Sequence, residues 1–365
     1  MPGRPLPSSE LAKKSYVRNL LQTIVHPGVC SGCAACVLAC PVDALGYEGD
    51  KPVLLDNCID CVLCSQACPR LELQAGAIGD LAFGPAGPPG EIGSFRQIVA
   101  ARATTAGISA VAQDGGMVTA VLTWALQRGL IEGATVSRRS ERQPWLPAPA
   151  LATTAEELLA CAGSAYTYSP NTLALEDAAA RGLAKVAFVG TGCQISGLRQ
   201  LQVAKSKKLR AIAAPVVLAI GLLCSETFDH QPFMHEQIAH GLGIDLADVV
   251  KINIKGRVLV SLRSGEVRSI PLKAVRPYAR QGCHYCQDFG AEYADISAGG
   301  LGLDGWTITT LRTAAGEEYF AGAARDGFLE TQPAAEFPTA LDLYARLALK
   351  QRERPQRPQP AGIAE

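Results

Sequence analysis

The sequence has no excess of charge of either sign and no long apolar run. Its 34 Lys+Arg residues match 34 Asp+Glu residues, so no overall electric field would recruit nucleic acid or anionic lipid. The longest apolar stretch, AIAAPVVLAIGLLC at 211–224, contains a proline and is shorter than the about 20 residues of a membrane-spanning helix. We therefore expect no nucleic-acid partner and no transmembrane segment, and the stretch is typical of a buried strand.

The sequence also lacks the features of an exported protein. Its first residues, MPGRPLPSSE, contain an arginine but not the apolar core that follows it in a secretory signal. We expect a cytoplasmic protein, for which peripheral association with a membrane complex stays open. Because cytosolic thiols stay reduced, the 13 cysteines indicate metal binding or redox chemistry rather than disulfides.

Composition divides the chain into five segments. We expect an amino-terminal extension (1–22), a small ferredoxin-like module (23–75), a Gly/Pro linker (76–93), a large domain (94–345) and a disordered tail (346–365). In the large domain, strands and helices alternate in short units, which predicts a mixed α/β fold. The 48% apolar content supports a sizeable core.

Local patterns predict individual elements. Apolar residues in GGMVTAVLTWALQRG recur at intervals of three and four residues, which indicates a helix that Gly129 would cap. The segment KVAFVGTGCQISGLRQL is typical of a strand, a tight turn and a helix. Further elements are expected as follows: a helix at 9–22, a strand at 96–103, a helix starting with a capping box at Thr154 and Glu157, and a hairpin at 251–272 that turns at RSGE.

The strongest motif is repeated. CSGCAACVLACP and CIDCVLCSQACP both have the spacing C-x-x-C-x-x-C-x-x-x-C-P, the pattern of bacterial ferredoxins with two [4Fe-4S] clusters. In these proteins each cluster takes three thiolates from one run and its fourth from the other. Thiolates are soft anionic ligands that suit tetrahedral iron, and the absence of histidine at ligand spacing disfavours zinc. The motif predicts one cluster on Cys30, Cys33, Cys36 and Cys68, and a second on Cys58, Cys61, Cys64 and Cys40.

Five cysteines lie outside the repeated block. Cys193 follows a predicted strand at a helix start and Cys224 ends another strand, so both belong to the sheet edge where ligands collect. Cys283 and Cys286 form a lone C-x-x-C pair, whereas Cys161 lies on an apolar helix face and is interpreted as a core residue. Spacing alone favours a third cluster on Cys193, Cys224, Cys283 and Cys286 no more than it favours a redox-active C-x-x-C pair or two buried thiols.

Four motifs in this order resemble a known family. AQDGGMVTAVLTWAL, GTGCQISGLR, GLLCSETF and CHYCQDFGAEYADISAGGLG are similar to the beta subunit of coenzyme F-420-reducing hydrogenase and its relatives, over residues 94–340. Those relatives include the input subunit of a membrane dehydrogenase, the beta subunit of F-420-dependent formate dehydrogenase, and chlorophyll-pathway reductases. An amino-terminal two-cluster module resembles the input-subunit form.

The resemblance implies FAD beside one [4Fe-4S] cluster, and therefore three clusters in the whole chain. It implies the third cluster on Cys193, Cys224, Cys283 and Cys286. Two departures are visible: Gly192 stands where the family often has proline, which predicts a looser turn, and Ala165 stands where a basic residue is common.

The same resemblance assigns residues to the flavin. Two glycines at a helix start can bring bare backbone N–H groups to a diphosphate, although alone this pattern is that of an ordinary loop-to-helix junction. A Rossmann site at GTG is disfavoured because Ile195 stands at the third glycine position. The implied cofactor-binding residues are Gln113, Gly115, Gly116 and Thr119, with Gly163, Ser164, Tyr166, Gly190 and Thr191.

A deazaflavin moves hydride whereas clusters move single electrons, so the resemblance implies a flavin between them. We expect an oxidoreductase that exchanges hydride between coenzyme F-420, the expected substrate, and FAD, with electrons passing to or from a partner subunit or a soluble ferredoxin. The chemistry is flavin-centred, so no catalytic side chain is assigned. Two alternatives stay open: a ferredoxin-dependent flavin reductase of a tetrapyrrole or another organic acceptor, and an electron-relay or interaction subunit without its own substrate site.

Overall fold

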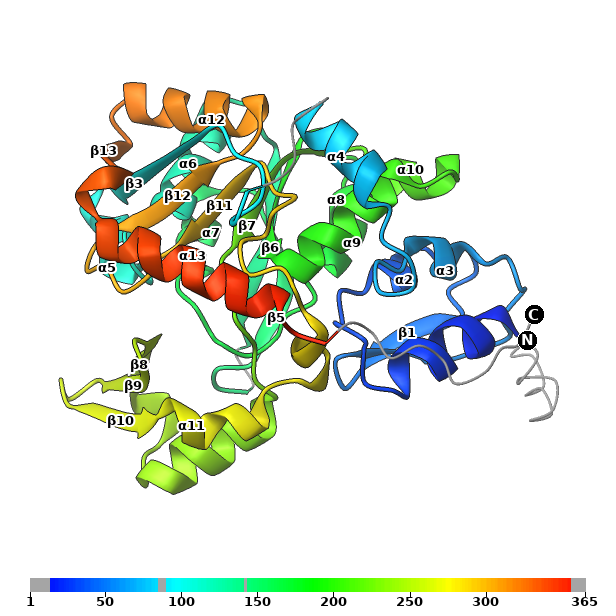
Figure 1. Ribbon diagram of the computed structural model, residues 1–365, viewed down its shortest axis with the longest axis horizontal. Coiled ribbons are helices and arrows are strands. Elements are labelled where there is room, and N and C mark those ends of the chain that lie inside the picture. Colours follow the sequence, from blue (N-terminus) through cyan, green and yellow to red (C-terminus); the bar gives the residue numbers. More distant parts are fainter. Residues whose placement is uncertain (1–13, 85–89, 141–142, 356–365) are drawn as a thin grey trace.

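A mixed eight-stranded sheet forms the centre of the large domain (Figure 1). The structure is a computed structural model that describes residues 14–84, 90–140 and 143–355. The large mixed sheet with its helices confirms the expected mixed α/β class. In spatial order the strands are β13 (Leu329–Pro333), β3 (Gln97–Ala103), β12 (Thr307–Leu311), β11 (Ile296–Gly299), β7 (Val216–Leu222), β6 (Val186–Thr191), β4 (Gly133–Arg139) and β5 (Pro147–Ala152).

Four neighbouring strands of this sheet are parallel. Strands β4, β6, β7 and β11 run in one direction, so their carboxyl ends meet at one edge of the sheet. Strand β6 is buried on both sides, as expected for a parallel strand covered by helices on both faces. The predicted strands at 96–103 and in PVVLAIGLLC are confirmed as β3 and β7.

Helices cover both faces of the sheet (Figure 1). Side chains of successive strand residues point to opposite faces, so Ala101 packs in one core and Ala100 in the other. The predicted cap of α6 is confirmed, because Gly129 has φ +65° directly after it. One face holds α5 (Ala106–Val111), α6 (Met117–Gln127), α7 (Ala155–Ala160) and α12 (Ala314–Arg325), and the other holds α8 (Ala174–Ala180), α9 (Gly192–Val203), α10 (Lys207–Ala213) and α13 (Pro338–Arg352).

A separate three-stranded sheet extends from the large domain (Figure 1). The hairpin predicted at 251–272 is confirmed, with its turn closed by the bond from the Leu262 N–H to the Glu266 carbonyl, 2.8 Å. The first residues of the predicted range form a separate third strand, which the sequence did not predict. The elements here are β8 (Val249–Ile254), β9 (Arg257–Leu262), β10 (Val267–Pro271), η3 (Gln231–His240), η4 (Leu246–Asp248), α11 (Leu272–Val275) and η5 (Arg276–Tyr278).

The amino-terminal module packs helix η1 (Tyr16–Val25) against the repeated motif. Apolar side chains recur every four residues along this helix, and Tyr16, Leu20 and Ile24 are buried beside the cysteines. Helix η1 crosses the predicted segment boundary at residue 22. The part of the predicted helix before residue 14 lies outside the described residues. The other elements are α2 (Ala35–Leu38), β1 (Leu45–Glu48), β2 (Lys51–Leu54) and α3 (Leu63–Ala67).

Two further segment predictions need correction. Helix α4 (Ala75–Phe83) occupies the first half of the predicted linker, because Ile78 finds a buried position against the large domain. Helix α13 continues through residues 346–352 of the predicted disordered tail, because its apolar period still buries Ala348. Residues 85–89 and 356–365 lie outside the described residues. Among the described helices, none has the length and apolar character to cross a membrane.

Candidate iron–sulfur and flavin sites

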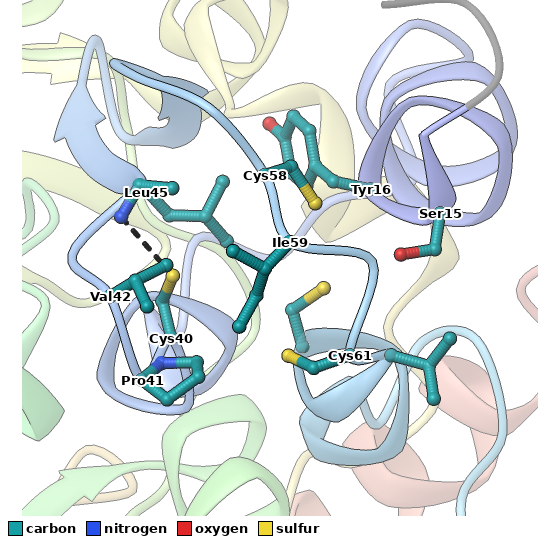
Figure 2. A pocket seen from close by; sticks show the side chains of 12 residues that line it. Ser15, Tyr16, Cys40, Pro41, Val42, Leu45, Cys58, Ile59 and Cys61 are labelled. Atoms are coloured by element: carbon teal, nitrogen blue, oxygen red, sulfur yellow. Dashed lines mark hydrogen bonds between the residues drawn. The ribbon is translucent and has the colours of Figure 1, made fainter. Parts of the chain in front are cut away.

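The outer set of thiols, defined as Cys40, Cys58, Cys61 and Cys64, lines one pocket of the amino-terminal module. Figure 2 shows Cys40, Cys58 and Cys61 around this pocket, with Ser15 and Tyr16 from the start of η1 at its rim. The Ala44 N–H donates to the Cys40 Sγ at 3.2 Å. The pocket therefore combines three cysteines of the second run with the last cysteine of the first, the grouping that the spacing predicts.

The inner set, defined as Cys30, Cys33, Cys36 and Cys68, is more deeply buried. Burial, followed by the nearby Cys68 thiol, raises the pKa of Cys33 to about 12, and burial raises the pKa of Cys68 to about 11. Burial also raises the pKa of Cys36, with Cys68 and Cys33 next in effect. Four such thiols together would bind as thiolates only with a cation between them.

The two runs share two local backbone features. Ala34 and Val62, each directly after the second cysteine of its run, have left-handed φ values of 62° and 57°. In both runs the N–H two residues after the first cysteine donates to that sulfur: Gly32 to Cys30 and Asp60 to Cys58, both at 3.4 Å. Hydrogen bonds to ligand sulfurs are one of the factors that set cluster potentials.

The late set, defined as Cys193, Cys224, Cys283 and Cys286, lines a second pocket. Cys193 is the second residue of α9, Cys224 follows β7, and the other two lie in and after the turn η6 (Gln281–Tyr285). The parallel sheet explains the grouping, because β6 and β7 end at the same edge. Burial raises the pKa of Cys224, with Cys283 and Cys193 next in effect.

The described residues offer no site for a single metal ion. Within the described ranges, no group of three or more His, Cys, Asp or Glu side chains is arranged to hold a single metal ion. A cubane has an iron atom at each of four corners, so its thiolates stand further apart than the ligands of one ion. The fit to clusters rests on the two thiol pockets and on the buried inner set.

The turn before Cys193 is tight rather than loose. Thr191 and Gln194 form a complete capping box at the start of α9. A Cβ atom on Gly192 would lie 2.5 Å from Oδ2 of Asp288, so the departure from proline makes room for this carboxyl group. Burial raises the pKa of Asp288 to about 6. The prediction of a looser turn is therefore wrong.

The end of α13 covers the late set, which the sequence did not predict. The Gln351 amide Nε2 donates to the Cys224 carbonyl at 3.1 Å and to the Cys286 Sγ at 3.6 Å. Just beyond the helix, Arg354 donates to the carbonyls of Ser225 and Cys283, both at 2.8 Å. The apolar period that continues through residues 346–352 is the only sequence feature that could have indicated this cover.

Three of the residues assigned to the flavin lie together. The Ser164 N–H donates to the Gln113 side-chain oxygen at 3.2 Å, and the Gln113 amide lies 3.3 Å from the Tyr166 hydroxyl. Tyr166 has a left-handed φ of 61°, a strained conformation of the kind that collects at functional sites. Cys224 is among the groups that raise the pKa of Tyr166, after burial and Asp114, so this cluster adjoins the late set.

The two glycines before α6 differ from each other. The Gly115 N–H already donates to the Thr307 hydroxyl at 3.1 Å, and a Cβ here would lie 2.5 Å from the Ala101 carbonyl. Gly115 is therefore a close-packing position and not a free donor. Gly116 has φ +76° and starts a helix with no side-chain cap, which leaves the N–H groups of the first turn, up to Thr119, open to a ligand.

The remaining assigned residues are Gly163, Gly190 and Thr191. Gly163 is exposed, with φ +94°, one residue before Ser164. Gly190 is buried, and a Cβ there would overlap Gln194 of the capping box, which gives this glycine a packing role. Thr191 lines the late pocket, and its hydroxyl lies 3.2 Å from the Cys193 Sγ.

Comparison with known families covers most of the large domain. The family model described as "Coenzyme F420 hydrogenase/dehydrogenase, beta subunit N-term" matches residues 98–176, and the companion model of the carboxy-terminal part of the same beta subunit matches residues 183–336. The chain belongs to this family. The resemblance inferred from the four motifs is thereby confirmed, and the chain is an oxidoreductase of the family's type.

Individual relatives extend the match. The chain is 37% identical over 268 residues to coenzyme F420 hydrogenase subunit beta of Methanothermobacter thermautotrophicus, covering 72% of this chain and 93% of that protein. It is 31% identical over 312 residues to a subunit of the F(420)H(2) dehydrogenase of Methanosarcina mazei, covering 81% of this chain and 83% of that protein. A chain of the F420-reducing [NiFe] hydrogenase complex from Methanosarcina barkeri superposes with a TM-score of 0.70 at 33% identity, over 74% of this chain and 92% of that one.

The amino-terminal module matches a family of its own. The model of a 4Fe-4S dicluster domain covers residues 22–69, which include both cysteine runs. Outside the three thiol sets, Cys161 is half-buried against the main core of the sheet, consistent with its interpretation as a core residue.

Proposed function

We propose that this family member is an iron–sulfur flavoprotein subunit that exchanges hydride between coenzyme F-420 and FAD and passes single electrons through three [4Fe-4S] clusters. One observation carries the proposal: four thiols from widely separated segments line one pocket at the carboxyl edge of the sheet. Relatives named as coenzyme F420 hydrogenase and dehydrogenase subunits support the substrate.

The residues around α6 suit FAD. The open N–H groups of its first turn would hold the diphosphate, since a helix start favours negative charge. Lys251, which donates to the Ala112 carbonyl at 3.1 Å, adds a positive charge next to this loop. The Gln113–Ser164–Tyr166 cluster would orient the ring system. When bound, a flavin supplies the ability to take up two electrons and release them singly.

The inner set lies between the late set and the outer set. Cys33 of the inner set and Cys193 of the late set are close enough that each charge would affect the other, and Cys64 of the outer set is likewise close to Cys36. An order of late, inner and outer clusters therefore suits electron transfer between the flavin and the surface of the amino-terminal module.

The outer set faces a surface suited to a redox partner. Three exposed apolar side chains line the pocket beside its cysteines, which is a mark of interaction sites: Val42, Ile59 and Val62. The partner would be a hydrogenase, dehydrogenase or reductase subunit, or a soluble ferredoxin. The hydrogenase relative of known structure is itself part of a complex, which supports a subunit role.

An anaerobic assay tests the proposal. Protein loaded with iron and FAD is mixed with reduced F-420, and the visible band of the oxidised coenzyme is followed. We expect this band to appear as the protein takes up hydride, with no change in protein stripped of flavin. An unchanged coenzyme in the presence of loaded protein would contradict the proposal. Iron analysis should give about twelve irons per chain for three cubanes, and about eight would exclude the third.

A further inference from the structure

Two arginines cross the contact between the inner and late sets in opposite directions. Arg70, two residues after Cys68 in the amino-terminal module, donates through Nη1 to the Tyr285 carbonyl at 2.7 Å and through Nη2 to the Gly282 carbonyl at 3.4 Å. Both carbonyls belong to the turn η6, which carries Cys283. Arg70 therefore fixes a ligand-bearing turn of the other domain.

Arg280 makes the reciprocal contact. It precedes Cys283 by three residues and donates through Nη1 to the Ser31 carbonyl at 2.9 Å and through Nη2 to the Asp50 carbonyl at 3.0 Å. Ser31 lies between the first two cysteines of the inner set. The guanidinium stacks on Tyr168, with Cζ 3.9 Å from the ring centroid, and the residue is 5% exposed. Each domain thus sends an arginine into the cysteine loop of the other.

The contact leaves no room for other side chains. A Cβ on Gly282 would overlap the Cys30 carbonyl, and a Cβ on Gly32 would overlap the Arg280 guanidinium. A Cβ on Gly197 of α9 would lie 3.1 Å from the Cys33 Sγ. The backbones of the two cysteine loops are therefore in direct contact, and the arginines hold them there.

The positive charges of Arg70 and Arg280 are largely buried and need opposite charge or hydrogen bonds nearby. Burying a guanidinium is unfavourable unless opposite charge or hydrogen bonds offset the loss of hydration. Arg280 has one carboxylate partner, Asp50, at 3.3 Å. The ionisable groups that act most on the Arg70 charge are the thiols of Cys286, Cys193 and Cys33. The two arginines thus face the two sets whose metallated forms carry negative charge.

We propose that Arg70 and Arg280 are positioning residues that hold the inner and late clusters at a fixed separation and stabilise their reduced forms. Each cluster gains one negative charge on reduction, and a cation in the low-dielectric interior lowers the free energy of that state. The inference rests on the proposed function, because it requires a cluster on the late set.

The test uses the whole chain with its clusters, titrated anaerobically with a reductant and followed by electron paramagnetic resonance. Arg70→Gln is expected to shift the reduction equilibrium of the late cluster about tenfold toward the oxidised form, a fall of about 59 mV. Arg70→Lys keeps the charge and should restore most of the potential. Arg102→Gln, which removes a surface arginine paired with Glu330, is the matched control and should change nothing.

The outcomes separate the two proposals. Wild-type protein with about eight irons and no late-cluster signal would defeat the third cluster, and this inference with it. With full iron, an unmoved late-cluster potential in Arg70→Gln, or an equal fall in Arg70→Lys, would overturn only the role of the arginine charge. If Arg70→Gln loses iron, the comparison of Arg70→Lys with wild type decides. An unchanged potential of the late cluster in Arg70→Lys supports the inference. A tenfold shift of its reduction equilibrium toward the oxidised form overturns it.

Discussion

The outer and late pockets each present four thiols, but the chain builds them in different ways. The outer pocket takes its cysteines from residues 40–64, whereas the late pocket needs the ends of β6 and β7 and a turn near residue 283. Each is bordered by a helix: η1 beside the outer pocket and α13 beside the late one. A short repeat encodes the first site, and the order of strands in a parallel sheet encodes the second.

The largest expected effect comes from removing one thiol of each pocket. Cys224→Ser should lower the iron content from about twelve to about eight per chain and leave the other two clusters. Cys58→Ser should remove the outer cluster and leave the late one. Cys161→Ser is the control and should keep all the iron. Iron analysis with electron paramagnetic resonance checks this; loss of all clusters in Cys224→Ser would mean that the sites do not form independently.

A second effect concerns the contact between the two domains. Gly282→Ala places a methyl group against the Cys30 carbonyl and should destabilise the protein by about 1–3 kcal/mol, because a packed site cannot take added volume. Gly107→Ala, where a Cβ would meet nothing within 4 Å, is the control and should not destabilise. Thermal unfolding of both variants measures the difference. Equal stability would mean that the cysteine loops can separate freely.

A smaller effect is expected from the cover of the late pocket. Gln351→Leu removes the hydrogen bond to the Cys286 Sγ, whose net worth is about 0.5–1.5 kcal/mol, so the reduction equilibrium of the late cluster should move about two- to tenfold toward the oxidised form. Lys350→Leu, on the exposed side of the same helix, should leave it unchanged. A redox titration measures both, and a higher potential in Gln351→Leu would contradict the assignment.

The smallest effect concerns the helix beside the outer pocket. The Ser15 N–H donates to the Asp60 carboxylate at 2.5 Å and lowers the Asp60 pKa below its usual 3.8. A depressed carboxyl pKa adds stability above the unfolded value, and this is lost as the pH falls through the folded value. Asp60→Asn should therefore unfold at a slightly lower temperature, by an amount that is constant from pH 7 to about 5. A difference in unfolding temperature between wild type and Asp60→Asn that grows as the pH falls would contradict the prediction.

The sequence predicts features that depend on neighbouring residues better than features that join residues far apart in the chain. The cysteine runs and strands β3, β6 and β7 follow from local spacing and apolar pattern, so they were predicted directly. The grouping of the late thiols could be inferred only from the resemblance to a family, because Cys193 and Cys283 are far apart in sequence and come together only when the sheet folds. That these thiols bind a cluster stays a prediction.

Other features could not be predicted because they join distant residues. Arg280 reaches Ser31 across 249 positions, and Gln351 reaches Cys224 across 127. A glycine pattern alone does not separate two roles: at Gly115 the missing side chain serves close packing against β3, which looks the same in sequence as an approach to a ligand. The wrong tail boundary has a similar origin, since Pro and Gln outweighed the apolar residues of α13 in composition.

The place of α13 in the chain has a consequence for biosynthesis. All four late thiols precede α13 in the chain, so they leave the ribosome before Gln351 and Arg354, which contact the late set in the folded protein. A cluster inserted before α13 docks would enter a pocket that lacks these contacts, and docking of α13 would then add them over the cluster.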